Sequence, residues 1–435
     1  MKIWSEKETL SREELRKLQF ERLSNTLALV YENVPHYQRK FKEAGIKPED
    51  IRCLDDIRHL PFTTKEDLRE TYPFGLFAKP KNKIVRYHAS SGTTGKPTVV
   101  GYTQNDMQVW TELIARIVTM GGVTDADTAQ ISFGFGLFTG AFGLQQGLEK
   151  VGAGVIPMSS GNTQKQIMIM QDFQTTALVA TPSYALHIAE VAYEMGIDPK
   201  KDLFLKYGLF GGEGSTEEMR SKLNEAWGIF STENYGMSEL IGPGVSGECL
   251  ALKGMHICED HFIAEIIDPE TLEVLPEGST GELVITPITK EALPLIRYRT
   301  KDITRLDFTP CDCGRTSARM AKITGRTDDM LIIGGVNVFP SQIEGVLLGI
   351  QGIGSNYQIR VLKKGYLDHI EIDVEVKDHN LLDSVTLLER LYKEIEVKLH
   401  TILGIHAGIH LVEPKSLARS EGKAKRVIDL RSEKL

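Results

Sequence analysis

The sequence predicts an α/β protein with a large N-terminal part, in which helices cover mostly parallel strands, and a small α/β unit at the C-terminal end. Strand-like runs alternate with capped helices over 176–227, short apolar runs between turns follow Asp260, and strand and helix patterns recur over 326–435. Such alternation is typical of a parallel sheet with helical crossovers. The short segments after Asp260 indicate an antiparallel β region.

The N-terminus is expected to be helical. Ser11 and Glu14 have the spacing of a capping box, and apolar residues follow at helical intervals. These residues are Leu15, Leu18, Leu23, Leu27 and Val30.

Two strand–helix pairs are expected in the middle of the chain. The apolar run 177–180 predicts a strand, and Thr181-Pro182 supplies an N-cap and a first helical residue after it. The run 205–210 predicts a second strand, with Ser215 as the N-cap of the next helix and Glu218 three residues further on.

The C-terminal unit is expected to contain two alternating strands, a helix and a last strand. These elements are predicted at 357–362, 369–376, 381–403 and 409–414. The junction falls near residues 325–329, so the predicted domains are a large one, 1–325, and a small one, 326–435.

Composition excludes several classes of protein. The formal charge is 51 − 59 = −8, whereas a nucleic-acid binder has a basic footprint. The first residues lack the apolar stretch of a signal peptide, and no apolar run reaches membrane-spanning length. Five cysteines in 435 residues do not form a disulfide framework. We therefore expect a cytoplasmic protein without nucleic-acid or membrane partners.

A loop rich in hydroxyl residues and glycine is the strongest local motif. Backbone N–H groups, hydroxyls and a lysine in a tight loop can surround a phosphate. The sequence differs from a Walker A loop because Pro97 replaces the Ser or Thr that binds Mg²⁺, and strand-like runs flank both sides. A surface hairpin is the ordinary alternative. The loop residues are Ser90, Ser91, Gly92, Thr93, Thr94, Gly95 and Lys96.

Several motifs together resemble the adenylate-forming enzymes. SSGTTGKP, YGMSE, RYRTKD, GRTDD and GK occur in the order of that superfamily, at 90–97, 235–239, 297–302, 325–329 and 422–423. The closer resemblance is to phenylacetate–CoA ligases and covers almost the whole chain. It rests on the stretches 259–268, 288–302, 323–344 and 420–429.

The resemblance implies that ATP joins an aryl carboxylic acid to coenzyme A through an acyl-adenylate, releasing AMP and pyrophosphate. The loop 90–96 would hold the β- and γ-phosphates. Asp302 would accept both ribose hydroxyls, Glu239 would bind Mg²⁺, and Tyr235 would pack on adenine. The further positions implied to contact nucleotide or coenzyme A are Gly212, Glu213, Gly236, Met237, Ser238, Arg326, Gly334 and Gly335.

The resemblance also implies a catalytic lysine on a moving domain. Lys423 would bridge the attacking carboxylate and the α-phosphate, because cations must offset the repulsion between these negative groups. Rotation about Asp328 would then withdraw Lys423 and admit the thiol. A solvated basic residue beside Lys425 is the ordinary alternative for Lys423.

Aromatic residues indicate a pocket for the acid. Phe135 and Phe138, with Phe133 and Phe142, lie in one glycine-rich segment, SFGFGLFTGAFG. Flat rings are suitable walls for an aryl group, although an aromatic core patch is equally compatible with this segment. Further candidate lining residues are Tyr184, Met237 and Ile241. We therefore predict phenylacetate or a similar aryl acid as substrate.

Cysteines and a histidine indicate a structural zinc site. Thiolates and imidazole suit tetrahedral Zn²⁺, and the predicted ligands are Cys249, His256, Cys311 and Cys313. Cys258 remains open as a substitute, since residues two apart share a strand face. Ordinary buried cysteines are the alternative, and Cys53 is expected only to pack.

Two other functions remain open. The acyl group could be loaded onto a carrier-protein thiol, or the chain could be a nucleotide-binding regulator without catalysis. The joint presence of Glu239, Asp302 and Lys423 argues against the regulator, because binding alone does not need all three. A homodimer is expected from the resemblance.

Overall fold

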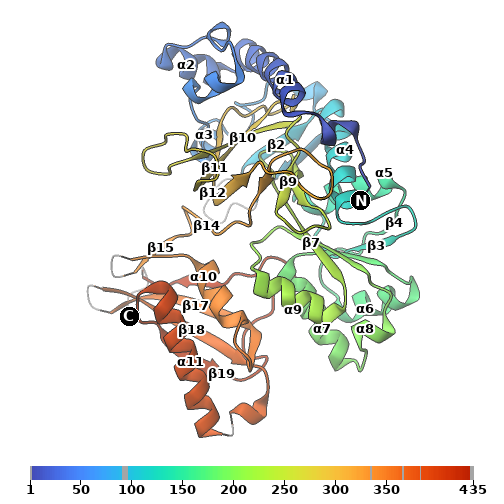
Figure 1. The fold of residues 1–435 in the computed structure, drawn as a ribbon, viewed down its shortest axis with the longest axis vertical. Coiled ribbons are helices and arrows are strands. Elements are labelled where there is room, and N and C mark those ends of the chain that lie inside the picture. Colours follow the sequence, from blue (N-terminus) through green and yellow to red (C-terminus); the bar gives the residue numbers. More distant parts are fainter. Residues whose placement is uncertain (1, 91–96, 334–335, 365–366, 383, 432–435) are drawn as a thin grey trace.

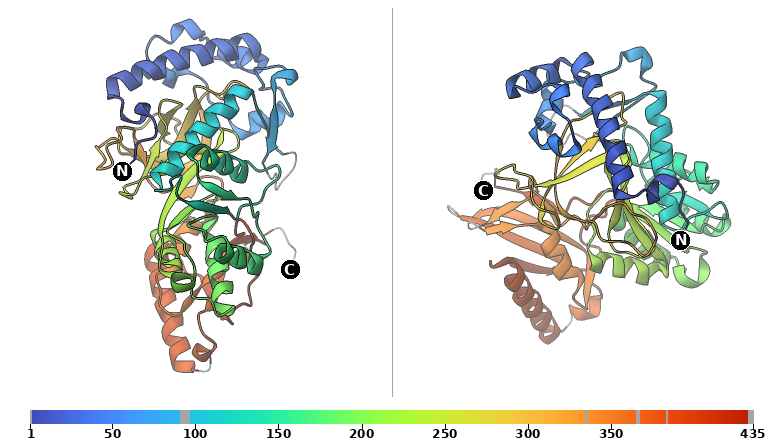
Figure 2. Two further views of the ribbon diagram at one scale, coloured as in Figure 1. Left: turned by 90° about the vertical axis from the view of Figure 1, so that its right-hand side faces the viewer. Right: turned by 45° about the horizontal axis from the view of Figure 1, so that its top comes forward.

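The computed structural model describes residues 2–90, 97–333, 336–364, 367–382 and 384–431. In Figure 1 the N-terminal helices lie at the top, strands run through the middle, and the C-terminal elements lie at the lower left. The turned views in Figure 2 show the same C-terminal elements at one end of the molecule. The described residues contain no helix that is long and apolar enough to cross a bilayer.

The N-terminal segment is helical, as predicted. The Ser11 side chain accepts from the Glu14 backbone N–H, and the Glu14 carboxylate accepts from the Ser11 N–H at 2.9 Å, which completes the capping box. The helices of this segment are α1 (Arg12–Asn33), α2 (Pro35–Ala44) and α3 (Lys65–Glu70). Strands β1 (Arg86–Ala89) and β2 (Val99–Tyr102) follow as an antiparallel pair, confirming the predicted strands on both sides of the phosphate loop.

One mixed sheet connects the predicted parallel sheet and the predicted antiparallel region. Strand β7 pairs parallel with β6 on one side and antiparallel with β8 on the other. Along the sheet the order is β10-β11-β12-β13-β9-β8-β7-β6-β5-β3-β4, and β14 pairs with β12. The parallel strands are β3 (Thr128–Ile131), β4 (Gly154–Ile156), β5 (Ala177–Ala180), β6 (Tyr207–Gly211) and β7 (Phe230–Met237). The antiparallel strands are β8 (Gly242–Glu248), β9 (Met255–Ile257), β10 (Phe262–Ile267), β11 (Thr280–Pro287), β12 (Tyr298–Asp307), β13 (Arg319–Met320) and β14 (Gly325–Arg326).

Helices cover both faces of the parallel half. In β5, Ala177 and Val179 belong to the core that α4 and α5 help to build, while Leu178 and Ala180 belong to the core under α6, α7 and α9. This division follows from the two-residue period of a strand and explains why the run 177–180 is apolar throughout. The helices are α4 (Gln104–Met120), α5 (Gly140–Val151), α6 (Thr163–Asp172), α7 (Pro182–Glu194), α8 (Pro199–Asp202) and α9 (Glu217–Trp227).

The helix starts are confirmed at α7 and wrong by one residue at α9. Thr181 caps α7, and Pro182 is its first residue. At α9 the cap is Thr216, whose hydroxyl accepts from the Met219 N–H at 3.1 Å, and not Ser215. Both residues are good N-caps, so composition alone does not choose between them.

The C-terminal part has its own hydrophobic core, built from residues between 331 and 409. Its four-stranded sheet has the order β19-β18-β17-β20. The prediction that 409–414 is the last strand is wrong, because β20 follows and pairs parallel with β17. The elements are β15 (Leu331–Ile333), β16 (Val336–Val338), α10 (Pro340–Leu348), β17 (Ile353–Lys364), β18 (Leu367–Val376), α11 (Val385–Leu403), β19 (Gly408–Val412) and β20 (Val427–Asp429).

Polar contacts around Glu190 of α7 join the C-terminal part to the large part. The Ser355 hydroxyl donates to Glu190 at 2.9 Å, and Arg419 Nε donates to it at 3.3 Å. Arg419 also donates to both carboxylate oxygens of Glu375 in β18. Partly exposed ion pairs contribute about 0–1 kcal/mol each, so each of these polar contacts is weak by itself, and Leu348 of α10 adds an apolar contact with the core under α7 and α9.

Candidate active site

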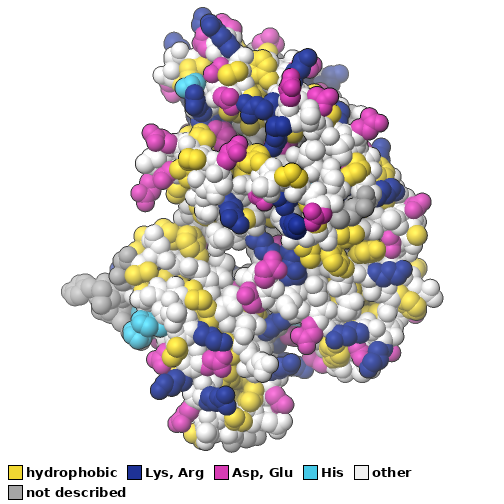
Figure 3. Space-filling model, in the orientation of Figure 1, with side chains coloured by type: hydrophobic (Ala, Val, Ile, Leu, Met, Phe, Trp, Pro, Cys, Tyr) yellow, Lys and Arg dark blue, Asp and Glu magenta, His cyan; other side chains and the backbone are white. Residues whose placement is uncertain are grey.

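Charged side chains gather in a hollow between the two parts. Figure 3 shows this hollow near the centre of the molecule, with basic and acidic side chains along it. Lys423 of the C-terminal part interacts electrostatically with Glu213, Asp302 and Glu239 of the large part. Four motifs that are far apart in the sequence therefore meet at one place.

Asp302 interacts with Lys423 and is the centre of a hydrogen-bonded group. It lies in β12 opposite Arg326 of β14. Arg326 Nη1 donates to Oδ1 at 2.7 Å, and the Tyr235 hydroxyl donates to Oδ2 at 2.6 Å. Burial raises the pKa of the Asp302 carboxyl, while Arg326 and Tyr235 oppose that rise. Each carboxylate oxygen is therefore held in place by one donor. Either oxygen could accept a hydrogen bond from a ligand hydroxyl in place of that donor.

Arg326 also connects Asp302 to the predicted hinge. Its Nε donates to Asp328 Oδ1 at 2.8 Å and its Nη2 donates to Oδ2 at 3.1 Å. The Asp328 side chain is about half exposed, at 47%. Its role as a hinge stays a prediction, but one guanidinium ties the predicted ribose-binding carboxylate to the predicted pivot.

The YGMSE motif forms the end of β7 and a tight turn. A Cβ at Gly236 would lie 1.9 Å from the Gly242 carbonyl oxygen, so only glycine fits there. The Ser238 hydroxyl lies 3.2 Å from the Thr139 hydroxyl at the start of α5. Met237 is the last residue of the strand and packs against the main core. The motif thus directs the chain from the end of β7 to Glu239.

Glu239 has the properties of a cation ligand. The residue is 6% exposed, and among the described residues no hydrogen bond or ion pair holds its carboxylate. The buried Lys290 ammonium donates to the Glu239 backbone carbonyl at 3.2 Å. Burial lowers the pKa of Lys290 to about 8, although Asp106 and Glu239 oppose that shift. The described residues thus leave this carboxylate available to a ligand, and its oxygens suit a hard divalent cation.

Glu213 holds the Lys423 segment against α7. Its carboxylate accepts from the Ser183 N–H at 2.7 Å and from the Ala424 N–H at 3.1 Å. The Thr181 hydroxyl donates to the Gly422 carbonyl at 3.0 Å. Directly before Glu213, Gly212 has φ +85°, a conformation that side chains rarely adopt. The backbone on both sides of Lys423 is thus fixed by the large part.

The Lys423 side chain itself points among charges and keeps contact with solvent. Desolvation by the surrounding protein lowers its pKa; Glu213, Asp302 and Glu239 oppose the shift, and Arg326 adds to it. Glu213 is the strongest of the acidic influences. An ammonium in this position suits a reaction between two anions.

Some predicted residues lie outside the described part of the chain. These are Ser91, Gly92, Thr93, Thr94, Gly95, Lys96, Gly334 and Gly335. Ser90 is described: its N–H donates to the Thr98 carbonyl at 3.0 Å, and its hydroxyl accepts from the Thr98 N–H at 3.2 Å. Ser90 therefore closes the hairpin at the base of the phosphate loop.

The predicted acid-pocket residues differ in exposure. Phe135 is partly buried and meets Phe142 edge-on at 5.1 Å between ring centroids. Phe138 is 51% exposed, whereas Ile241 and Tyr184 are 1% and 0% exposed. The Tyr184 hydroxyl accepts from the Gly161 N–H at 2.9 Å. Whether these residues contact an acid stays a prediction.

Two contributors to the site escape sequence reasoning. Lys290 gives no sequence signal of burial, since lysine is almost always exposed. Thr181 and Ser183 are readable as helix-start residues, but their hydroxyls also bind the Gly422 carbonyl, 239 or more residues away. A cavity of about 600 Å³ between α9, α10 and α11 is lined by none of the predicted site residues.

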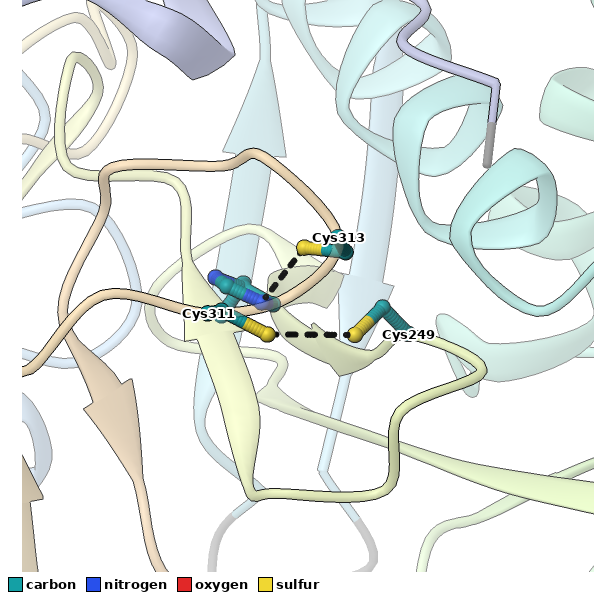
Figure 4. Close-up of side chains that lie close together, drawn as sticks. Cys249, Cys311 and Cys313 are labelled. Carbon is teal, nitrogen blue, oxygen red and sulfur yellow. Dashed lines mark hydrogen bonds between the residues drawn. The ribbon is translucent and has the colours of Figure 1, made fainter.

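The four predicted metal ligands converge. Their ligand atoms all lie within 4.8 Å of one another, and all four residues are buried. Cys249 Sγ lies 3.8 Å from Cys311 Sγ, and Cys313 Sγ lies 3.3 Å from His256 Nε2, as Figure 4 shows for the thiols. Burial opposes ionisation of Cys313, but the contact with His256 lowers its pKa to about 5. Ser317 Oγ lies 3.1 Å from His256 Nδ1 and orients the ring.

The remaining cysteines take no part in this cluster. Cys258 is buried, and burial raises its pKa to about 12. It packs in the main hydrophobic core, and it is not among the four residues whose ligand atoms converge, so it does not substitute for His256. The expectation that Cys53 packs internally is wrong, because Cys53 is exposed.

The chain matches two family models and several full-length relatives. The model described as AMP-binding enzyme matches residues 28–287, and the model of the AMP-binding enzyme C-terminal domain matches 335–431. A phenylacetate–coenzyme A ligase of Thermus thermophilus is 48% identical over 98% of this chain and 99% of the relative. The chain belongs to the phenylacetate–CoA ligase family. A family member of that name from Escherichia coli K12 is 46% identical over 98% of this chain and 97% of the relative.

Solved structures agree with this assignment to the AMP-binding enzymes. A 2-hydroxyisobutyryl-CoA ligase in its postadenylation state superimposes with a TM-score of 0.92, at 30% identity over 97% of this chain and 91% of that chain. In its thioesterification state, with CoA, the TM-score is 0.73, at 31% identity over 98% of this chain and 92% of that chain. This member of the phenylacetate–CoA ligase family is thus an acid–thiol ligase with the adenylate-forming fold.

Proposed function

We propose that this ligase joins phenylacetate, or a closely related aryl acid, to coenzyme A in two steps at one site. The acid carboxylate attacks the α-phosphorus of ATP, which gives an acyl-adenylate and pyrophosphate. The CoA thiol then attacks the acyl carbon, so that the thioester forms, AMP leaves and the thiol proton is released. The observation that carries this proposal is the meeting of Lys423 with Glu213, Asp302 and Glu239.

Nucleotide binding follows from the groups around Asp302. Its carboxylate would accept the two ribose hydroxyls, with Arg326 beside it and the Tyr235 ring against adenine. Gly212 and Glu213 would lie along the adenine and α-phosphate side. The geometry supports this assignment because Tyr235 and Arg326 both already bind Asp302.

Lys423 would act in the first step. Two anionic groups must approach each other, and an ammonium between them lowers the cost of that approach in a site with little water. The Glu213 carboxylate accepts from the Ala424 N–H at 3.1 Å, which keeps the lysine segment at the site. Lys423 is proposed over Lys425 because its ammonium interacts electrostatically with Glu213, Asp302 and Glu239.

Closure of the C-terminal part fits the first step. The TM-score is 0.92 against the postadenylation state of the relative and 0.73 against its thioesterification state. A rotation near Asp328 would exchange the arrangement that presents Lys423 for one that admits the thiol. The domains 1–325 and 326–435 are proposed on this basis.

An aryl acid is supported by the relatives and by the aromatic segment. Phe135 and Phe142 lie within ring contact, and flat rings of this kind suit an aryl group. Met237 and Ile241 follow Tyr235 in the turn beside α5. We propose that Phe138 and Tyr184 complete the pocket at its outer and inner ends, as their exposures of 51% and 0% suggest.

The residues present fit a magnesium ion at Glu239. No hydrogen bond or ion pair within the described residues holds this carboxylate, and hard cations take one or two carboxylates together with phosphate oxygens. When bound, Mg²⁺ neutralises phosphate charge. The chain's own contribution is to hold Glu239 at the end of a rigid turn.

The cysteine cluster fits structural zinc. Four ligand atoms within 4.8 Å can move to bonds of about 2.0–2.3 Å around one tetrahedral Zn²⁺. Arg315, two residues from Cys313, donates to Glu8 and to the Lys2 carbonyl. A bound ion would therefore fix the contact between the β region and the N-terminal segment, with no role in the chemistry.

Release of AMP tests the function directly. With ATP and Mg²⁺, we expect AMP to appear only when CoA and an aryl acid are both present, with phenylacetate preferred over acetate and long fatty acids. Activity with a carrier-protein thiol but not with CoA would favour the carrier alternative. No AMP with any acid or thiol would favour the non-catalytic regulator.

Compartment and assembly remain proposals. All five cysteines are free, which suits a cytoplasmic enzyme in reducing conditions. The homodimer is drawn from the resemblance, and sedimentation of the purified ligase checks it.

A further inference from the structure

Three buried side chains hold alternate carbonyl groups of the turn that follows the YGMSE motif. Each donor comes from a different element: β2, α4 and the segment between β11 and β12. The three bonds are Lys290 Nζ to the Glu239 carbonyl at 3.2 Å, the Tyr102 hydroxyl to the Ile241 carbonyl at 2.9 Å, and Trp110 Nε1 to the Pro243 carbonyl at 2.7 Å. We call these three donors the carbonyl clamp.

The members of the carbonyl clamp also hold one another. Lys290 Nζ lies 4.9 Å from the centroid of the Tyr102 ring. The Tyr102 and Trp110 rings stack at 4.9 Å between centroids with 13° between their planes. A cation over an aromatic face is stabilised further when it is desolvated, and all three side chains are buried. A shift of one donor therefore disturbs the other two.

The position of Lys290 is costly for stability alone. A buried ammonium requires compensating partners, and within the described residues its one hydrogen bond goes to the Glu239 carbonyl. The nearby Asp106 carboxylate already accepts from the N–H groups of Thr103, Glu291 and Ala292. A neutral donor would hold the turn equally well. The positive charge therefore indicates a second role, an electrostatic interaction with the nearby Glu239 carboxylate.

Two residues of the clamped turn carry different proposed functions. Glu239 is the proposed magnesium ligand, and Ile241 is a proposed wall of the acid pocket. We infer that Lys290 is a positioning residue for adenylation, which sets the Glu239 carboxylate against the charge of the nucleotide, while Tyr102 sets Ile241 against the acid. This inference rests on the proposed function.

Two substitutions separate these roles. Lys290→Met keeps the length of the side chain but removes its charge and its donor. We expect acyl-adenylate formation to slow by about 10²-fold, the cost of a misplaced group, and the Mg²⁺ concentration for half-maximal rate to rise several-fold. Tyr102→Phe removes one hydroxyl and keeps the stack. It should raise KM for the acid several-fold and leave the Mg²⁺ requirement unchanged.

A matched control excludes a general loss of stability. Tyr37 is another fully buried tyrosine, whose hydroxyl bonds Thr63 and the Ile296 N–H. Tyr37→Phe should lower the unfolding temperature as Tyr102→Phe does, without changing KM for the acid. The inference is wrong if all three variants lose activity only in proportion to their loss of stability. In that case neither the Mg²⁺ requirement nor KM for the acid would change selectively.

Glu239→Gln distinguishes this inference from the proposed function. If this variant keeps the wild-type Mg²⁺ requirement, the role proposed for Glu239 fails. If it raises that requirement and Lys290→Met does not, the role of Glu239 stands and the inference about Lys290 fails. A raised requirement in both variants supports both proposals.

Discussion

Lys423 carries a positive charge, and hydrogen bonds hold the backbone on both sides of it against the large part. The Glu213 carboxylate binds the backbone of the next residue, Ala424, and the Thr181 hydroxyl binds the backbone of the residue before, Gly422. The side chain is therefore placed through the backbone of its two neighbours, which leaves its ammonium available to a ligand. Asp302 is placed differently, by direct bonds from Arg326 and Tyr235.

Replacing Lys423 by alanine tests this placement. We expect acyl-adenylate formation to fall by at least about 10²–10³-fold, because an electrostatic contact to the reacting groups is lost. Thioester formation from supplied acyl-adenylate should stay within about threefold of wild type. The two half-reactions are measured by pyrophosphate exchange and by thioester release. Equal losses in both would contradict a role limited to the first step.

At the residue scale the ordered motifs of the resemblance point to Asp302, Glu213 and Lys423, and the roles of these residues stay predictions. The sequence says less about their environment. The burial of Lys290 is not predictable, since it depends on an aromatic stack from β2 and α4. Cys258 shows a similar limit: spacing leaves it open as a metal ligand, but long-range packing places it in the main core, outside the ligand cluster.

The antiparallel half of the sheet depends on buried polar contacts with α4 and the cysteine cluster. Arg116 of α4 donates to both oxygens of Asp260 at 2.7 and 3.2 Å, and both side chains are 3% exposed. Burial would raise the pKa of Asp260, but the hydrogen bond from His261 and the pair with Arg116 hold it well below its usual range. Removing one partner of such a pair costs about 3–5 kcal/mol.

Asp260 therefore predicts a pH dependence of stability. Because its folded pKa is depressed, its contribution is present above the unfolded value of about 3.9 and is lost as the pH falls towards the folded value. Asp260→Asn should be less stable than wild type by about 3–5 kcal/mol at pH 7. The difference should shrink below about pH 4. Urea unfolding at several pH values measures it, and a constant difference down to pH 3 would contradict the account.

Zinc removal is the second prediction at the element scale. Purified protein should contain about one Zn²⁺ per chain, and chelation or Cys313→Ser should lower the unfolding temperature by several degrees, since a structural zinc site contributes folding free energy. Activity at low temperature should persist. Mass spectrometry under native conditions and calorimetry provide the readouts. Ser317→Ala, which only removes the partner of His256, is the milder control, and protein free of metal would end the claim.

Elements were more predictable than their assembly. The strands at 177–180 and at 369–376 follow local patterns and are confirmed. The junction of parallel and antiparallel halves through β7 depends on long-range pairing, which leaves no local pattern. Strand β20 escaped prediction because it has only three residues and forms by pairing with β17.

For the whole molecule, the polar contacts at Glu190 are individually weak enough to allow a change of arrangement. Glu190 binds Ser355 and Arg419 across the junction. Each such contact is worth about 0–1 kcal/mol, which is small enough for ligands to shift the balance. Ligands could therefore shift the C-terminal part away from the arrangement that resembles the postadenylation state of the relative.

Glu190→Ala should weaken this arrangement selectively. A loss of about 1 kcal/mol lowers the fraction in the adenylation arrangement by about fivefold at most. We expect a drop of that size in acyl-adenylate formation, with thioester formation from supplied adenylate equal or faster. Lys415→Ala, which removes a more exposed contact to Glu194 on the same helix, is the matched control with a smaller effect. A slower second step would contradict the assignment.

The path of a carboxylate oxygen tests the central claim. If the acid attacks the α-phosphorus, phenylacetate labelled with ¹⁸O in its carboxylate gives AMP that carries one ¹⁸O in its phosphate after a turnover with CoA. We predict this label in AMP, with none in pyrophosphate. Unlabelled AMP, or label in inorganic phosphate, would contradict an acyl-adenylate and with it the roles assigned to Lys423 and Asp302.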